Sequence, residues 1–216
     1  MNSRWSKELS ASRRCSRMLF TTLFLCLVAA CSRSQSQATE TSDHQAQTAP
    51  SLAPDYGELE SISVQALNYT PWYIHTFSIA GPEGSDISGG GPNVMPSQGD
   101  NKPSGGGGGT CCFTYPRKWQ PDLRLTVRWL ADKKMDGKTP GYWCKAENVR
   151  IARYGRTNYS AWAIFLPDDR VRLMITDGTD GGNNPDNRPA DDDPLVVKGV
   201  LDDEWNQLYR EGGNTQ

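Results

Sequence analysis

Residues 122–129 read DLRLTVRW, and this stretch decides the fold class. Apolar side chains at Leu123, Leu125, Val127 and Trp129 alternate with polar ones. Because successive side chains of a β-strand point to opposite faces, the pattern places one face in a core and the other in water. The stretch therefore predicts a half-buried strand.

Further segments carry strand signals of similar length, namely residues 61–67, 72–79, 148–154, 161–166 and 170–176. The pattern over 72–79 places His75 on the same face as Tyr73, Phe77 and Ile79, which predicts a hydrogen-bonded core histidine. Pro167-Asp168-Asp169 separates the last two segments and is typical of a hairpin turn. Two glycine runs, 89–91 and 105–109, predict a mobile loop between strands.

A single helix is expected near the C-terminus. Asp202 can cap it, Trp205, Leu208 and Tyr209 share one face, and Gly212 ends it. Short strands, turn-rich connections and little helix indicate a mainly β domain. We expect an antiparallel β-sandwich or a barrel-like domain with a short C-terminal helix.

The first 30 residues read as a targeting segment. Basic residues precede the apolar run Met18–Ala30, which has the length of a signal-peptide core. The run ends in Val28-Ala29-Ala30-Cys31, which resembles the lipobox of bacterial lipoproteins. Residues 1–30 are therefore predicted to be a lipoprotein signal peptide, with Cys31 lipidated; the alternative is an ordinary secretory signal with an incidental cysteine.

The segment 31–55 is rich in Ser, Gln, Ala and Thr and predicts a flexible tether between the anchor and one domain, 56–216. Ser32, rather than Asp, follows the cysteine, which resembles sorting to the outer membrane, facing the periplasm. Removing residues 1–30 takes away five of 23 basic and one of 25 acidic residues, so 18 minus 24 gives a net charge of −6. This balance argues against a nucleic-acid partner.

Residues from 59 to 176 carry a set of motifs that resembles a bacterial lipoprotein family known as domain of unknown function 3304. The motifs are a glycine run, Cys111-Cys112, Pro116, Trp119, Pro121, the Val127 and Trp129 strand, Asn68-Tyr69-Thr70, His75-Thr76, Phe165-Leu166-Pro167-Asp168 and Arg170-Val171. Some members of the family behave like periplasmic immunity proteins of type VI secretion lipase effectors. The resemblance implies a binding role rather than a reaction.

Lipidation of Cys31 leaves three other cysteines after the signal peptide, and thiols in an oxidising envelope pair where geometry allows. A bridge from Cys112, or from Cys111, to Cys144 closes a loop of roughly 30 residues and would contribute about 3–4 kcal/mol. A bridge between the two adjacent cysteines constrains little. We therefore expect Cys112–Cys144 or Cys111–Cys144.

The loop from 177 to 193 is acidic, rich in Gly and Asn, and unmatched by the family pattern. Its spacing does not fit a calcium loop. Loops on a rigid sheet carry specificity, and clustered carboxylates speed the encounter with a basic partner. The predicted partner contacts are therefore its acidic side chains Asp177, Asp180, Asp186, Asp191, Asp192 and Asp193.

Catalysis is not expected. No G-x-S-x-G motif occurs, and the chain after residue 30 holds two histidines, His44 and His75. No catalytic residue, metal ligand or cofactor is predicted. Arg117, Lys118 and Trp119 are either a contact patch or ordinary packing and solvated residues.

The sequence therefore predicts an outer-membrane-anchored, non-catalytic binding protein that masks a secreted antibacterial effector, such as a lipase. The alternative is a structural or glycan-binding envelope lipoprotein, in which Tyr142, Trp143 and Trp162 would stack on sugars.

Overall fold

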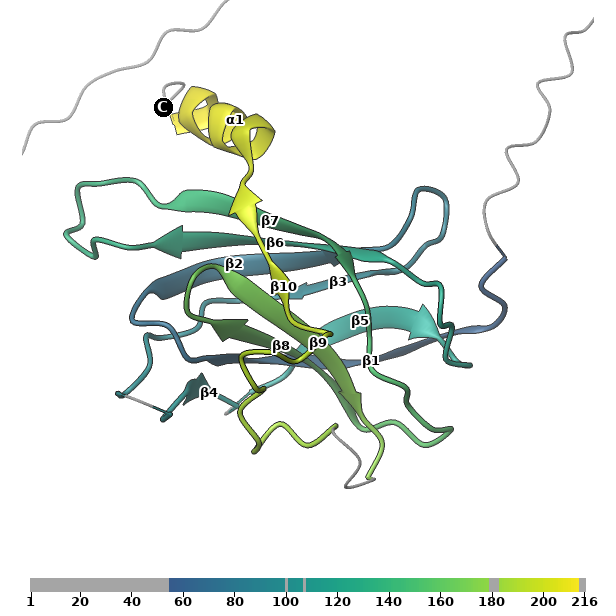
Figure 1. Cartoon of the computed structure of the whole chain (residues 1–216). Coiled ribbons are helices and arrows are strands. Elements are labelled where there is room, and N and C mark those ends of the chain that lie inside the picture. The colour runs from purple at the N-terminus through teal and green to yellow at the C-terminus, as the bar shows by residue number, and fades with distance from the viewer. Residues whose placement is uncertain (1–54, 100, 107, 179–182, 214–216) are drawn as a thin grey trace, which may run out of the picture. The chain divides into compact units, whose positions relative to one another are not determined.

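The computed structural model describes residues 55–99, 101–106, 108–178 and 183–213. These residues form two sheets that pack as a sandwich, with one short helix at the C-terminal end and no closed barrel (Figure 1). The mainly β prediction is confirmed, in its sandwich form. The predicted signal peptide, Cys31 and the tether up to residue 54 lie outside the described residues.

The first sheet is built around β1, which pairs with three other strands. Its order is β10-β9-β8-β1-β4, and β5 also pairs with β1. The β1–β8 pair is parallel, whereas β4 and β5 run antiparallel to β1, so the sheet is mixed. The strands are β1 (Leu59–Asn68), β4 (Ser104–Gly105), β5 (Thr110–Pro116), β8 (Ser160–Leu166), β9 (Arg170–Thr176) and β10 (Val197–Lys198).

The second sheet is antiparallel, in the order β11-β7-β6-β2-β3. Its strands are β2 (Tyr73–Ala80), β3 (Ser88–Gly91), β6 (Leu125–Asp132), β7 (Tyr142–Val149) and β11 (Val200–Leu201), and helix α1 (Asp203–Gly213) follows β11. The first glycine run is therefore a strand and not part of a mobile loop. It is glycine because a Cβ on Gly91 would lie 2.5 Å from the Phe77 ring, and one on Gly89 would lie 2.8 Å from Phe113.

The core lies between the sheets. The four alternating apolar residues of the 122–129 stretch are all buried, as predicted, although β6 itself begins at Leu125. Facing them from the first sheet are Ala163 and Phe165 of β8 and aliphatic side chains of β1 and β9. Phe165 packs against the rings of both Phe77 and Trp129, at 5.5 and 5.7 Å between centroids.

His75 is not a core residue. The β2–β6 pairing shifts register between Ile74 and Thr76, so Ile74 joins Phe77 and Ile79 in the core while Tyr73 and His75 turn outward. A bulge inserts one residue and thereby reverses which side chains face the core. The His75 side chain is 42% exposed and lies 3.9 Å from Asp132.

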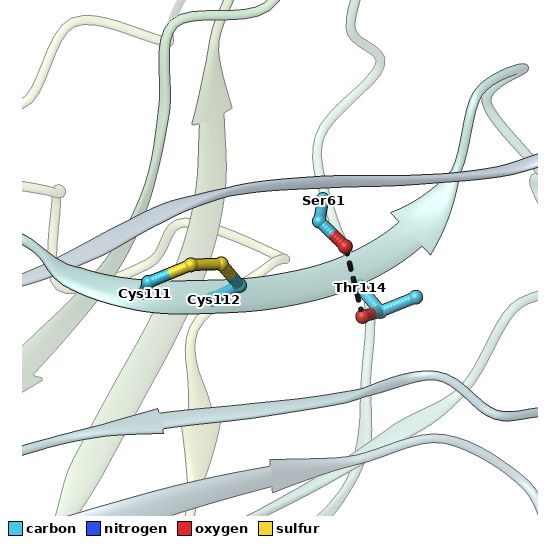
Figure 2. Close-up of a disulfide and its surroundings, with 4 residues drawn as sticks. All are labelled: Ser61, Cys111, Cys112 and Thr114. Carbon is cyan, nitrogen blue, oxygen red and sulfur yellow. Dashed lines mark hydrogen bonds between the residues drawn. A yellow bond between two sulfur atoms is a disulfide. The ribbon is translucent and has the colours of Figure 1, made fainter.

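The cysteine pairing differs from the predicted one. Cys111 is bonded to Cys112, adjacent on β5, and Cys144 is a free, buried cysteine (Figure 2). The β1–β5 register passes from the Ile62–Phe113 pair to the Ser63–Cys111 pair, so Cys112 has no partner of its own. This bulge breaks the alternation on which the predicted bridge depended.

Cys144 lies in the other sheet, on β7, where it pairs in register with Trp129. Burial raises the pKa of the Cys144 thiol to about 12, with a smaller contribution from Asp169. The thiol is therefore protonated at neutral pH and acts as a small apolar side chain rather than as a nucleophile.

The described part of the chain contains one helix, and the eleven residues of α1 fall short of the length that a membrane span requires.

Candidate functional site

The acidic stretch continues in the structure to Val196, and we call its described part, residues 183–196, the acidic loop. It packs on the outer face of the first sheet through ion pairs. Asp193 lies 2.8 Å from the guanidinium of Arg172, and Asp191 lies 2.9 Å from Arg170 and 3.3 Å from Arg188. Arg170 and Arg172 project from β9 on the face away from the core, because they pair in register with Leu166 and Ile164 of β8. Two of the predicted partner contacts thus hold the loop on the sheet.

The pKa shifts of Asp191 and Arg172 agree with a role of these ion pairs in holding the loop on the sheet. The hydrogen bond from Arg170, together with the charge of Arg188, lowers the pKa of Asp191 below its usual range. Burial lowers the pKa of the Arg172 guanidinium, and the neighbouring Asp193 carboxylate opposes this effect. The side chain of Arg172 is only 8% exposed, and the Asp193 carboxylate compensates the charge that burial would otherwise penalise.

The loop covers a second apolar cluster, formed by Leu67, Tyr69, Ile164, Leu166 and Met174, with Trp162 and Val196 packed against it. Arg188 of the loop lies 5.8 Å above the ring of Tyr69. This cover explains why β8 is apolar apart from Ser160, and why both faces of β8 and β9 are largely buried.

The remaining predicted contacts are divided between structural and exposed positions. Asp177 accepts a hydrogen bond from the backbone N–H of Gly155, at 2.7 Å. Asp186 and Asp192 are exposed and form no ion pair with a described residue. Asp180 lies outside the described residues.

A different surface is more strongly marked for contact. The described residues expose seven large apolar side chains; Met95, Met135 and Tyr159 are scattered, and four fall within ten residues of chain at the C-terminal end. These four, Val200, Leu201, Leu208 and Tyr209, are 63, 57, 58 and 43% exposed, and we call them the C-terminal surface. Four exposed apolar residues on two consecutive elements, β11 and α1, make this end of the chain a candidate binding surface.

Helix α1 is fixed in place beside this surface. Asp202 caps the helix, as predicted, by accepting a hydrogen bond from the N–H of Trp205 at 3.3 Å, and it also pairs with Arg128 at 2.8 Å. Asn206 binds the backbone of Trp143 twice, accepting from its N–H at 2.8 Å and donating to its carbonyl at 2.9 Å. The guanidinium of Arg128 lies 5.0 Å above the Trp205 ring.

The contacts that join α1 and its cap to the second sheet are made by Asp202 and Asn206, which are polar, and by Trp205. The shared apolar face of the predicted helix is therefore only partly packed, and Leu208 and Tyr209 remain exposed. A pocket of about 440 Å³, lined by Leu201, Asn206, Arg210 and Glu211 among others, adjoins the helix. Tyr142 and Leu201 are the apolar residues of its lining, and the other lining residues are polar or charged.

The three aromatic residues considered for sugar stacking do not form one platform. Trp143 meets Trp205 edge to face, at 4.7 Å between ring centroids. Trp162 belongs to the other sheet, packs against the covered cluster and donates its indole N–H to Ser160 at 2.8 Å. Within the described ranges no three His, Cys, Asp or Glu side chains are gathered as a metal site would require.

Residues 67–173 match the model of a family described as a protein of unknown function, DUF3304. The match runs from the end of β1 into β9, within the range from which the motifs were drawn. No curated protein matches the chain. The acidic loop and the C-terminal surface both lie beyond the matched residues.

Proposed function

We propose that this chain, whose residues 67–173 match the DUF3304 family model, is an outer-membrane-anchored periplasmic lipoprotein that binds and thereby masks a secreted antibacterial effector, such as a lipase. The observation that carries the binding role is the C-terminal surface. Four large apolar side chains stay in water on elements held rigidly by Asp202 and Asn206. Burying such side chains against a partner is favourable, and a preformed surface loses little entropy on binding.

The position of this surface bears on specificity. It lies beyond residue 173, so recognition of one particular effector would depend on residues that the family match does not cover. Asp186 and Asp192 on the acidic loop are the exposed carboxylates that would steer a basic partner, because rim charges act mainly on the association rate.

Replacing both Leu201 and Leu208 by serine should weaken binding to the effector encoded beside this protein by roughly tenfold or more, since central apolar anchors dominate interface energy. Calorimetric titration of the purified proteins measures this. The matched control is Met95→Ser, which removes an equally exposed side chain elsewhere. An equal affinity for the double variant and the control would show that the interface lies elsewhere, and no binding to any neighbouring gene product would favour the envelope-binding alternative.

Anchoring has its own test. Cys31→Ser should leave an uncleaved precursor or a soluble, mislocalised protein, because stable membrane attachment needs the acyl chains that this cysteine would carry. Processing and membrane fractionation of the variant in cells measure this. Normal cleavage together with normal outer-membrane fractionation would refute the lipoprotein assignment.

A further inference from the structure

A pocket of about 540 Å³ lies where β5 ends, between residues 117–119 and 153–156. Its walls carry four cations and two aromatic rings, from Arg117, Lys118, Trp119, Arg153, Tyr154 and Arg156, which we call the basic pocket. The chain as a whole has more acidic than basic residues, 25 against 23. The gathering of four cations is therefore a local feature.

Most of this positive charge is not used within the domain. Arg117 is paired, at 3.0 Å with Glu58 and 3.2 Å with Glu60. Lys118, Arg153 and Arg156 are exposed and form no ion pair with any described residue. The one carboxylate lining the pocket, that of Asp177, accepts the backbone N–H of Gly155. Three cations are therefore available to a ligand.

The aromatic walls are fixed by hydrogen bonds. The indole N–H of Trp119 donates to the carbonyl of Ile151 at 3.0 Å, and the hydroxyl of Tyr154 donates to the carbonyl of Pro116 at 2.6 Å. The guanidinium of Arg153 lies 5.9 Å above the Trp119 ring. A ligand would thus meet a preformed surface on which little order has to be gained.

The basic pocket lies at the point where the chain enters the domain. The backbone N–H of Arg117 donates to the carbonyl of Glu58 at 2.8 Å, and Pro116 pairs in register with Leu59, the first residue of β1. Figure 1 places the start of β1 and helix α1 at separate ends of the sandwich. A flexible segment of about 25 residues typically spans roughly 25–30 Å, so a tether from an anchor at Cys31 would allow this end of the domain to reach the lipid headgroups.

We propose that the basic pocket binds the phosphate groups of anionic phospholipid headgroups and so orients the domain on the membrane. Guanidinium groups form paired hydrogen bonds with phosphate oxygens, and tryptophan is favoured at the membrane interface. A phosphate also carries enough charge to engage several cations at once. This inference rests on the anchoring part of the proposed function, and it leaves the C-terminal surface accessible to a protein partner.

Vesicle sedimentation tests the inference without the acyl chains. The main core and the side chains packed against it lie between Tyr56 and Val197, so a protein beginning at residue 49 retains the folded domain. It should bind vesicles of phosphatidylcholine with one quarter phosphatidylglycerol, bind pure phosphatidylcholine vesicles far less, and lose affinity as salt rises. Lys118→Glu with Arg156→Glu should lower the partition coefficient about 25-fold or more, since each basic residue near an anionic surface contributes about fivefold.

The matched control is Lys134→Glu with Lys138→Glu, which makes the same change of charge at exposed positions outside the pocket. Equal losses in the two double variants would mean that only net charge matters and would overturn the inference. So would equal binding to both kinds of vesicle, or binding of free glycerol phosphate without vesicle binding. None of these three outcomes affects Cys31 processing or effector binding, which are measured separately. The melting temperature of each variant is measured as well, so a variant that loses vesicle binding because it is unfolded is recognised.

Discussion

Replacing Asp193 by asparagine should destabilise the domain by about 3–5 kcal/mol, because it breaks the buried ion pair between Asp193 and Arg172 by removing one of its two charges. For a domain of this size that corresponds to a fall in Tm of roughly 6–20 °C. The amide oxygen can still accept the hydrogen bond that Asp193 receives from the N–H of Leu195, so the substitution keeps this local contact while it removes the charge and the acceptor that face Arg172. Thermal unfolding followed by circular dichroism measures the effect.

Asp192→Asn is the control, since it removes the neighbouring exposed carboxylate and should change stability by no more than about 0.5 kcal/mol. Combining Asp193→Asn with Arg172→Met should restore much of the loss, because replacing both members of a buried ion pair by uncharged groups is often near neutral. Similar Tm values for the two single variants would show that Arg172 does not depend on Asp193.

Asn68→Asp should cost about 3 kcal/mol or more, although it changes a single atom of the side chain. The Asn68 amide nitrogen donates to the carbonyls of Trp72 at 2.7 Å and Met95 at 2.9 Å, and its oxygen accepts from the N–H and hydroxyl of Thr70. A carboxylate would face both carbonyls with no proton to donate, in a site with no exposure to solvent.

Urea denaturation of the variant at several pH values measures this effect. Protonation of the new carboxyl would supply one donor. The difference in unfolding free energy between the variant and the original protein should therefore become smaller as the pH falls. Asn93→Asp, at an exposed asparagine, is the control and should be nearly neutral. If the two variants unfolded at the same urea concentration, the amide of Asn68 would not be holding the turn.

The same contacts change the interpretation of the Asn68-Tyr69-Thr70 motif. Asn68 ties the β1–β2 turn to the segment after β3, and the Tyr69 ring lies under Arg188 of the acidic loop. The part of the family match that contains this motif therefore maintains the fold. Partner recognition, on the present proposal, depends on the residues that follow the match.

The acidic loop shows where interpretation by composition fails. A run of carboxylates indicates a solvated or partner-binding surface, yet Asp191 and Asp193 compensate arginines that β9 presents on its outer face. Arg170 and Arg172 are visible in the sequence as the polar interruptions of an apolar strand. Their partners are about 20 residues away along the chain, and no local spacing connects the two sets.

Strand prediction succeeded where one face is buried and the alternation is unbroken, as at 122–129, 61–67 and the 161–176 hairpin. It failed at 148–154, where the structure has only the last two residues of β7, Asn148 and Val149, and the isolated bridge at Ile151, and it missed β5 and most of β7. Residues of β7 show mixed burial, and β5 contains the bulge at Cys112, so neither strand shows a clean period of two.

The sequence by itself determined the fold class, the C-terminal helix with its Asp202 cap, the β8–β9 hairpin and the family resemblance, because each depends on residues close together in the chain. The tertiary structure alone decided which cysteines pair, which way His75 points, what the acidic loop covers, and that Leu208 and Tyr209 remain exposed. It also brought residues 117–119 and 153–156 together as the basic pocket. These features depend on register shifts and on contacts between distant segments, and a single bulge, which local patterns do not encode, is enough to reverse them.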